Sequence, residues 1–240
     1  MNVIESIARR VLQSATVTYK EQISANTYHI RISGEGLEKM EYRPGENLRV
    51  FVGMGQPTSL KEKVRTYSVW NYDAAEKRID LAANILSSGP GATWARDVQP
   101  GDTVYFAGPK GRFTVDDSGD FYIFIGDISA LAHLYEIRRN LQPGKKTYGI
   151  IYSPEEKDFF FDIDGKAPFN FYKMPLNATP LIIQELSYLS EEFSGRGIVY
   201  IAGDVRICRE LYRHFRFEFR WSPRRVKTKP FWDPGKTGLE

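Results

Sequence analysis

Cysteine is almost absent from this chain of 240 residues, which contains only Cys208. A single cysteine excludes an internal disulfide, an iron–sulfur cluster held by thiolates and a zinc site built from cysteines. The three histidines, His29, His133 and His214, are far apart in the sequence and fall in none of the zinc motifs, so no metal site is predicted. Redox chemistry would therefore require a bound organic cofactor or a metal site of another kind.

Long apolar runs are also missing. No segment approaches the roughly 18 consecutive apolar residues of a membrane-spanning helix, and the first ten residues, MNVIESIARR, lack the apolar core of a secretion signal. Hydrophobic residues make up 42% of the chain and charged residues 26%, which is typical of folded, water-soluble proteins. We therefore expect a cytoplasmic protein without a membrane span.

The net charge of +3 is unevenly distributed. Residues 206–236 contain ten Lys and Arg against three Asp and Glu, whereas residues 1–205 contain 23 against 26. Five arginines in this basic segment are spaced to lie along one helix face: Arg206, Arg209, Arg213, Arg216 and Arg220. The stripe is either a solvated helix face or an electropositive wall that attracts an anionic partner. Nucleic acid is not expected as that partner, because no DNA- or RNA-binding motif is present.

The pattern of the chain changes near residue 115. Before it, six short strands are predicted at 14–23, 26–33, 47–52, 64–70, 77–86 and 103–107, with a helix at 93–98. After it, apolar strands alternate with helices predicted at 129–141, 181–189 and 204–220, and the strands are at 121–126, 147–152, 169–172 and 197–203. The expected fold is an antiparallel barrel domain (1–115) followed by an α/β domain with a parallel sheet and a basic C-terminal tail (116–240).

Two neighbouring segments of the first domain carry the strongest motif. Arg65-Thr66-Tyr67-Ser68 resembles the R-x-Y-[ST] flavin motif of the ferredoxin reductase superfamily, and a glycine-rich turn and helix start follow it. A flavin needs an aromatic wall, a cation for its pyrophosphate and a hydroxyl near the ring nitrogen that accepts hydride. The strand must bend or end near Ser68, because alternation places Ser68 opposite Arg65 and Tyr67. The predicted FAD-binding residues are Arg65, Thr66, Tyr67, Ser68, Gly89, Pro90, Gly91, Ala92, Thr93 and Trp94, with Tyr67 and Ser68 at the reacting ring.

The resemblance then extends along nearly the whole chain. The ordered segments RTYSVWNYD, SSGPGATWARDVQPGDTVYFAGPKGRF, GDISAL, IAGD and KPFWDPGKTG are similar to the siderophore-interacting protein family. The chain departs from the family at Ala83-Asn84-Ile85-Leu86, where many relatives have a histidine. The resemblance implies an FAD-dependent enzyme that uses NAD(P)H to reduce ferric siderophores.

A nicotinamide site is expected at the carboxyl ends of the second domain's strands. Gly126 and Asp127 end its first strand, and Ser129 opens the helix that follows. Gly203 and Asp204 follow the later strand GIVYIA, on the same edge of the sheet, where open α/β sheets bind ligands. The G-x-G-x-x-G fingerprint is absent, so the dinucleotide is implied by the resemblance, and Asp127 serves equally well as a helix N-cap. Lys173 is the one cation near this edge that suits a ribose phosphate.

The predicted function is electron transfer from NAD(P)H through FAD to iron(III) in a ferric siderophore or another ferric chelate. Lys227 and Lys229 are the predicted substrate-binding residues, and Phe231-Trp232 either covers the cofactor cleft or pins the tail to the domain. Two alternatives stay open: a reductase of free flavin, flavodoxin or ferredoxin, and a non-catalytic protein that binds flavin or siderophore.

Overall fold

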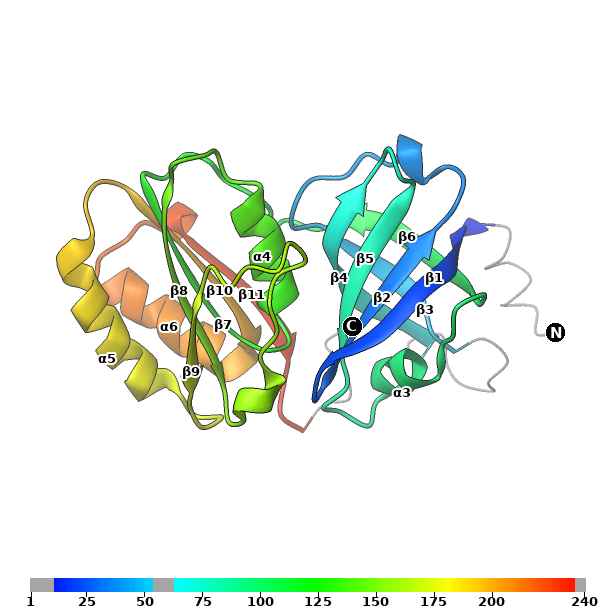
Figure 1. Cartoon of the computed structure of the whole chain (residues 1–240). Coiled ribbons are helices and arrows are strands. Elements are labelled where there is room, and N and C mark those ends of the chain that lie inside the picture. Colours follow the sequence, from blue (N-terminus) through cyan, green and yellow to red (C-terminus); the bar gives the residue numbers. More distant parts are fainter. Residues whose placement is uncertain (1–10, 54–62, 236–240) are drawn as a thin grey trace. The chain divides into compact units, whose positions relative to one another are not determined.

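The computed structural model describes residues 11–53 and 63–235. The chain forms two compact units that divide between Arg112 and Phe113. Figure 1 shows a barrel in the first unit and a sheet with helices in the second, and each is treated separately below.

The first unit is a closed antiparallel barrel with the strand order β1-β2-β5-β4-β3-β6. Its elements are β1 (Gln13–Ser24), β2 (Thr27–Ser33), β3 (Asn47–Phe51), β4 (Val64–Asp73), β5 (Arg78–Asn84), α3 (Pro90–Asp97) and β6 (Thr103–Lys110). Alternate apolar side chains, among them Ile30, Leu48 and Val69, fill the interior. The predicted six-stranded barrel is confirmed.

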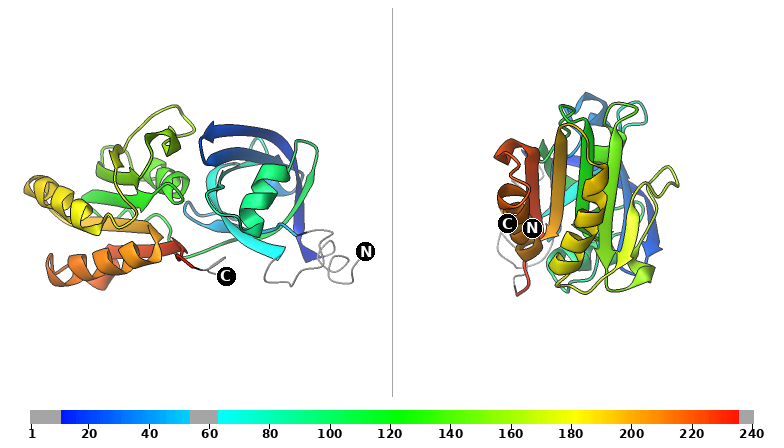
Figure 2. Two further views of the ribbon diagram at one scale, coloured as in Figure 1. Left: turned by 90° about the horizontal axis from the view of Figure 1, so that it is seen from below. Right: turned by 90° about the vertical axis from the view of Figure 1, so that its left-hand side faces the viewer.

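Helix α3 lies over one end of this barrel (Figure 2, left). Ala95 joins the barrel core, and Trp94 packs against it. The helix begins at Pro90, three residues before the predicted start at Thr93, because proline is well suited to the first helical position and Gly89 is the N-cap. The expected glycine-rich turn is therefore the first turn of the helix itself.

The second unit contains a five-stranded sheet with the order β11-β10-β7-β8-β9, in which every neighbouring pair is parallel. Its elements are β7 (Phe121–Asp127), α4 (Leu131–Arg139), β8 (Lys146–Ser153), β9 (Asn170–Lys173), α5 (Thr179–Leu189), β10 (Gly197–Asp204), α6 (Val205–Phe217) and β11 (Val226–Trp232). The predicted parallel sheet is confirmed, but β11 was expected to be a tail.

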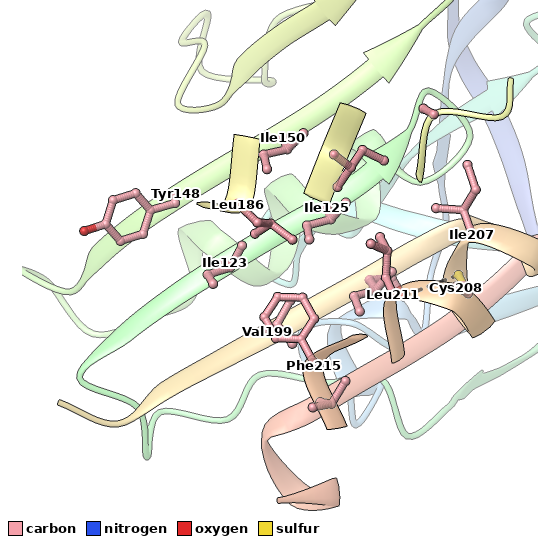
Figure 3. Close-up of a cluster of buried hydrophobic side chains, with 14 of the residues drawn as sticks. Ile123, Ile125, Tyr148, Ile150, Leu186, Val199, Ile207, Cys208, Leu211 and Phe215 are labelled. Carbon is pink, nitrogen blue, oxygen red and sulfur yellow. Dashed lines mark hydrogen bonds between the residues drawn. The ribbon is translucent and has the colours of Figure 1, made fainter. Parts of the chain in front are cut away.

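Helices α5 and α6 cover one face of this sheet, and α4 covers the other (Figures 1 and 2). Ile123, Ile125 and Val199 of the sheet meet Leu186, Leu211 and Phe215 of the two helices in a buried cluster (Figure 3). Along α6, the apolar residues Ile207, Leu211 and Phe215 are buried, whereas Arg206, Arg209 and Arg213 are exposed. The predicted separation of the two helix faces is therefore correct, although α6 ends at Phe217 and not at Arg220.

The connections of β7 and β10 run in opposite directions across the sheet. From β7 the chain passes through α4 to β8 on one side, and from β10 it passes through α6 to β11 on the other side. The chain therefore diverges between the carboxyl ends of β7 and β10. In open α/β sheets this switch point is where ligands bind.

Candidate functional site

Part of the predicted flavin motif comes together at the start of α3. The Tyr67 hydroxyl donates a hydrogen bond of 2.7 Å to the Gly91 carbonyl, and the Tyr67 and Trp94 rings lie 5.1 Å apart. A Cβ atom at position 91 would lie 3.0 Å from Tyr67 Oη and 3.2 Å from Arg65 Cγ. Glycine at this position therefore lets the strand and the helix approach closely.

Thr66 and Ser68 lie on the other face of β4. Tyr67 and Val69 belong to the barrel core, so alternation turns their neighbours away from it. The strand continues past Ser68 to Asp73, with a register irregularity only between Val69 and Asn71. The strand was expected to bend or end near Ser68; it does not end there, but its register becomes irregular from the next residue, Val69. The place of Ser68 at the flavin ring stays a prediction.

The chemistry of these residues fits the pyrophosphate of FAD. Arg65 is partly exposed beside the first turn of α3, which contains Gly91, Ala92 and Thr93. A guanidinium and the N–H groups of a helix N-terminus are both suited to phosphate oxygens. The predicted flavin residues Arg65, Tyr67, Gly89, Pro90, Gly91, Ala92, Thr93 and Trp94 are thus gathered in one place.

Asp127 is the centre of a hydrogen-bonded cluster at the switch point. Its Oδ1 atom accepts hydrogen bonds from the Ser129 backbone N–H (2.8 Å) and the Ser129 hydroxyl. Its Oδ2 atom accepts them from the Asp204 backbone N–H (2.9 Å) and from Trp232 Nε1 (2.8 Å). One carboxylate thereby ties together the ends of β7, β10 and β11, and both of its oxygens are engaged.

Burial raises the pKa of the Asp127 carboxyl, and these hydrogen bonds from Ser129, Trp232 and Asp204 oppose that effect. The alternative role of Asp127 as a helix N-cap is wrong. The N-cap of α4 is Ala130, and Ser129, which was expected to open that helix, lies in the preceding turn. Asp127 instead stabilises that turn and its junction with the neighbouring strands.

Gly203 and Asp204 complete this edge of the sheet. Gly203 has a φ of 119°, and a Cβ atom there would lie 2.2 Å from Asp127 Oδ2, so only glycine fits without a shift. Asp204 is the N-cap of α6: its Oδ1 atom accepts the Arg206 backbone N–H at 2.8 Å, and its Oδ2 atom forms an ion pair with Arg206 Nη2 at 2.6 Å. Gly126 pairs in register with Ala202 on the adjoining strand. The predicted nicotinamide residues are therefore neighbours in space.

The two predicted substrate lysines lie on β11, not on a tail. Lys227 forms an ion pair of 2.8 Å with Asp116. Burial raises the pKa of Asp116, but the pair with Lys227 and the hydrogen bonds from Ser118 outweigh it and lower this pKa to about 2. Burial lowers the pKa of Lys229 to about 8, and its Nζ atom lies 5.1 Å from the centre of the Phe231 ring. Lys173 ends β9 and is exposed. Lys227 thus has an acidic partner that sequence reasoning did not identify.

At the carboxyl edge, sequence reasoning missed the specific contact of Trp232 and did not identify Tyr152. Trp232 was considered either a cleft cover or a pin that holds the tail to the domain, and its indole N–H hydrogen bond with Asp127 agrees with the pin. The available signal was that a buried tryptophan usually places this N–H on an acceptor. Tyr152, near the end of β8, was not considered at all, because it reads as one more apolar residue of a buried strand.

Within residues 11–53 and 63–235, no group of three or more His, Cys, Asp or Glu side chains is arranged to hold a metal ion. No helix in the same ranges combines the length and the apolar character needed to cross a bilayer.

Comparisons with known proteins agree with the two-unit arrangement. Residues 54–113 match the siderophore-interacting FAD-binding domain, and residues 119–235 match the siderophore-interacting protein family. Ferric vibriobactin reductase ViuB of Vibrio cholerae is 24% identical over 265 residues, covering 98% of this chain and 93% of that protein. The NADPH-dependent ferric-chelate reductase of Escherichia coli is 23% identical, with coverage of 90% and 91%. Among solved structures, a siderophore utilization protein from T. fusca superposes with a TM-score of 0.77 at 17% identity, over 95% of each chain.

Proposed function

This chain belongs to the siderophore-interacting protein family and has that family's FAD-binding domain, and from that premise we propose that it is a cytoplasmic ferric-siderophore reductase. In this proposal NAD(P)H supplies two electrons as a hydride, and two iron(III) ions in ferric siderophores each accept one of them. Hard oxygen ligands hold iron(III) much more tightly than iron(II), so reduction releases the metal from its chelate. The observation that carries the proposal is the presence of both sites in one chain: the Arg65–Tyr67–Gly91 cluster and the Asp127–Asp204 edge.

The first unit would bind FAD, which when bound accepts a hydride and passes on single electrons. The Arg65 guanidinium would neutralise the pyrophosphate beside the N-terminus of α3. Tyr67 would present its ring at a fixed angle, because its hydroxyl is held by the Gly91 carbonyl. Ser68, which is buried on β4, would be the hydroxyl near the ring nitrogen that accepts hydride.

The second unit would bind the dinucleotide at the switch point. Glycine at 203 lets the Asp127 carboxylate lie directly against the end of β10, so these two residues would shape the site together. Asp127 would act by positioning, since four protein donors already occupy its oxygens. Asp204 would contribute negative charge near the developing positive charge of the nicotinamide, moderated by its ion pair with Arg206.

The ferric siderophore would be attracted by the basic segment of this unit. Arg209 and Arg213 are exposed on α6, whereas the charge of Lys227 is partly neutralised by Asp116. Burial lowers the pKa of Lys229 to about 8, and both lysines of β11 stay candidates for contact with an anionic chelate. The names of the relatives from V. cholerae and E. coli, both of them ferric reductases, support this choice of acceptor.

The test is anaerobic reduction by the purified protein loaded with FAD. NADH and NADPH are supplied in turn, with ferric catecholates, ferric citrate, free flavin and ferredoxin as acceptors. Rapid reduction of ferric chelates in preference to the other acceptors is the expected result. Preference for free flavin or ferredoxin would make the chain a reductase of that class, and no reduction of the bound flavin would make it a binding protein.

The FAD assignment has its own test with a matched control. Arg65→Ala removes the charge-assisted contacts to the pyrophosphate and is expected to weaken FAD binding by one to two decades, or about 1.5–3 kcal/mol. Arg49→Ala removes an exposed arginine from the adjacent strand β3 and should leave the affinity unchanged. Equal FAD affinities of the two variants in a fluorescence titration would place the cofactor elsewhere.

A further inference from the structure

Tyr152 has an unusual hydroxyl at the carboxyl edge of the sheet. It is the penultimate residue of β8 and pairs in register with Asp127 on β7. Its side chain is 2% exposed and belongs to the core on the side of α5 and α6. Within the part of the chain that the structure describes, the hydroxyl oxygen has no hydrogen-bond partner.

The nearby carboxylates do not accept this hydroxyl, although both influence it. Asp127 and Asp204 each help to raise the pKa of the Tyr152 phenol above its ordinary value, with burial as the main cause, so the phenol keeps its proton. The oxygens of Asp127 are occupied by Ser129, Asp204 and Trp232. Those of Asp204 are occupied by the backbone and guanidinium of Arg206.

A buried donor without an acceptor is unfavourable, and a phenylalanine would fill the same volume without that cost. The position of the hydroxyl suggests what offsets the cost. It lies at the end of the strand that follows the first helix of the sheet, beside the switch point. In dinucleotide-binding sheets, residues at this strand end contact the ribose on the adenosine side of the cofactor.

We propose that Tyr152 is a dinucleotide-binding residue, whose hydroxyl donates a hydrogen bond to a ribose or phosphate oxygen in the adenosine half of NAD(P)H. This inference rests on the proposed use of NAD(P)H. The Arg206 side chain is 50% exposed and lies within electrostatic range of the phenol, so the proposal requires its ion pair with Asp204 to open when the ligand enters.

The test compares Tyr152→Phe with Tyr148→Phe. Tyr148 lies on the same strand and in the same core cluster, but its hydroxyl already donates to the Glu192 carbonyl at 3.2 Å. The FAD-loaded proteins are titrated with NADH, with AMP and with nicotinamide mononucleotide, and unfolding in urea is measured without ligand.

For Tyr152→Phe we expect NADH and AMP to bind about three- to tenfold more weakly, in keeping with the loss of one hydrogen bond. Binding of nicotinamide mononucleotide and FAD should be unchanged, and stability without ligand should be equal or higher. Tyr148→Phe should lose stability and keep its affinity for all four ligands.

Two results would overturn the inference. Unchanged binding of NADH and AMP by Tyr152→Phe would show that the hydroxyl does not contact the dinucleotide. A loss of stability without ligand would show that a buried water or another group already satisfies the hydroxyl. Failure of the wild-type protein to bind NADH or NADPH would instead contradict the proposed function, so the two failures are distinguishable.

Discussion

Replacing Asp127 with asparagine tests whether its carboxylate holds the switch point together. The side chain accepts four hydrogen bonds from three residues, Ser129, Asp204 and Trp232, which come from three parts of the chain. Asparagine has nearly the same shape, but it retains one acceptor oxygen and turns an NH2 group towards two of the donors.

The expected loss follows from these contacts. A hydrogen bond to a charged acceptor contributes about 1.5–3 kcal/mol, and two of the four would be lost. Part of this loss is offset, because a carboxylate no longer has to be buried, as the raised pKa of Asp127 indicates. We therefore expect Asp127→Asn to destabilise the protein by about 2–4 kcal/mol, measured by urea unfolding.

Ser129→Ala and Trp232→Phe are the graded comparisons. Each removes one side-chain donor from the cluster and keeps the carboxylate, so each should cost about 1 kcal/mol. The double variant Asp127→Asn, Trp232→Phe should lose less stability than the two single variants lose together, because these two residues share one hydrogen bond. If Asp127→Asn were as stable as the wild type to within about 0.5 kcal/mol, the Asp127 carboxylate would not be what holds the switch point together.

Three further predictions concern the same unit. Gly203→Ala should cost more than about 3 kcal/mol, because the added Cβ would collide with the Asp127 carboxylate at a positive φ; thermal unfolding measures this loss. The folded-state pKa of Asp116 lies below its ordinary value, so the stability from its pair with Lys227 is present above about pH 4 and is lost as the pH falls towards 2. Asp116→Asn should therefore be less stable than wild type by about 0.5–1 kcal/mol at pH 6, and a gap that persisted undiminished at pH 2 would contradict the pairing. Because the pKa of Lys229 is about 8 in the folded state and higher in the unfolded state, the burial of its charge opposes folding below pH 8, and stability should rise with pH from about 8 to 10. NMR of methylated lysines checks the value directly, and a midpoint for Lys229 above 10 would disprove it.

The sequence was informative wherever a signal was local. Alternating apolar residues located the barrel strands and the buried strands β7, β8 and β10, and the helical spacing located α6 with its buried Leu211 and exposed Arg213. Local signals failed at β11, since VKTKPFW contains two lysines and a proline and does not read as a strand. Its pairing with β10 comes from the sheet and not from its own composition.

The candidate sites show the same distinction. Arg65, Tyr67 and Asp127 could be identified from motifs, because a motif is defined by residue types at fixed spacings along the chain. The partners of those residues could not be selected in this way. Asp127 and Trp232 are separated by 105 positions and meet only because β11 lies beside β10. The unsatisfied Tyr152 hydroxyl could not be predicted either, because it depends on which neighbouring acceptors are already occupied.

The composition of β11 also has a consequence for association between molecules. It is the outermost strand on its side of the sheet, where an unpaired backbone could template a strand from a second chain. Pro230 has no N–H to donate to such a strand. An added strand would also lie beside the charged side chains of Lys227 and Lys229, which disfavours the pairing. The opposite edge, β9, is only four residues long and ends in Lys173. Both edges of the sheet are therefore poor starting points for aggregation, even though its centre is almost entirely apolar.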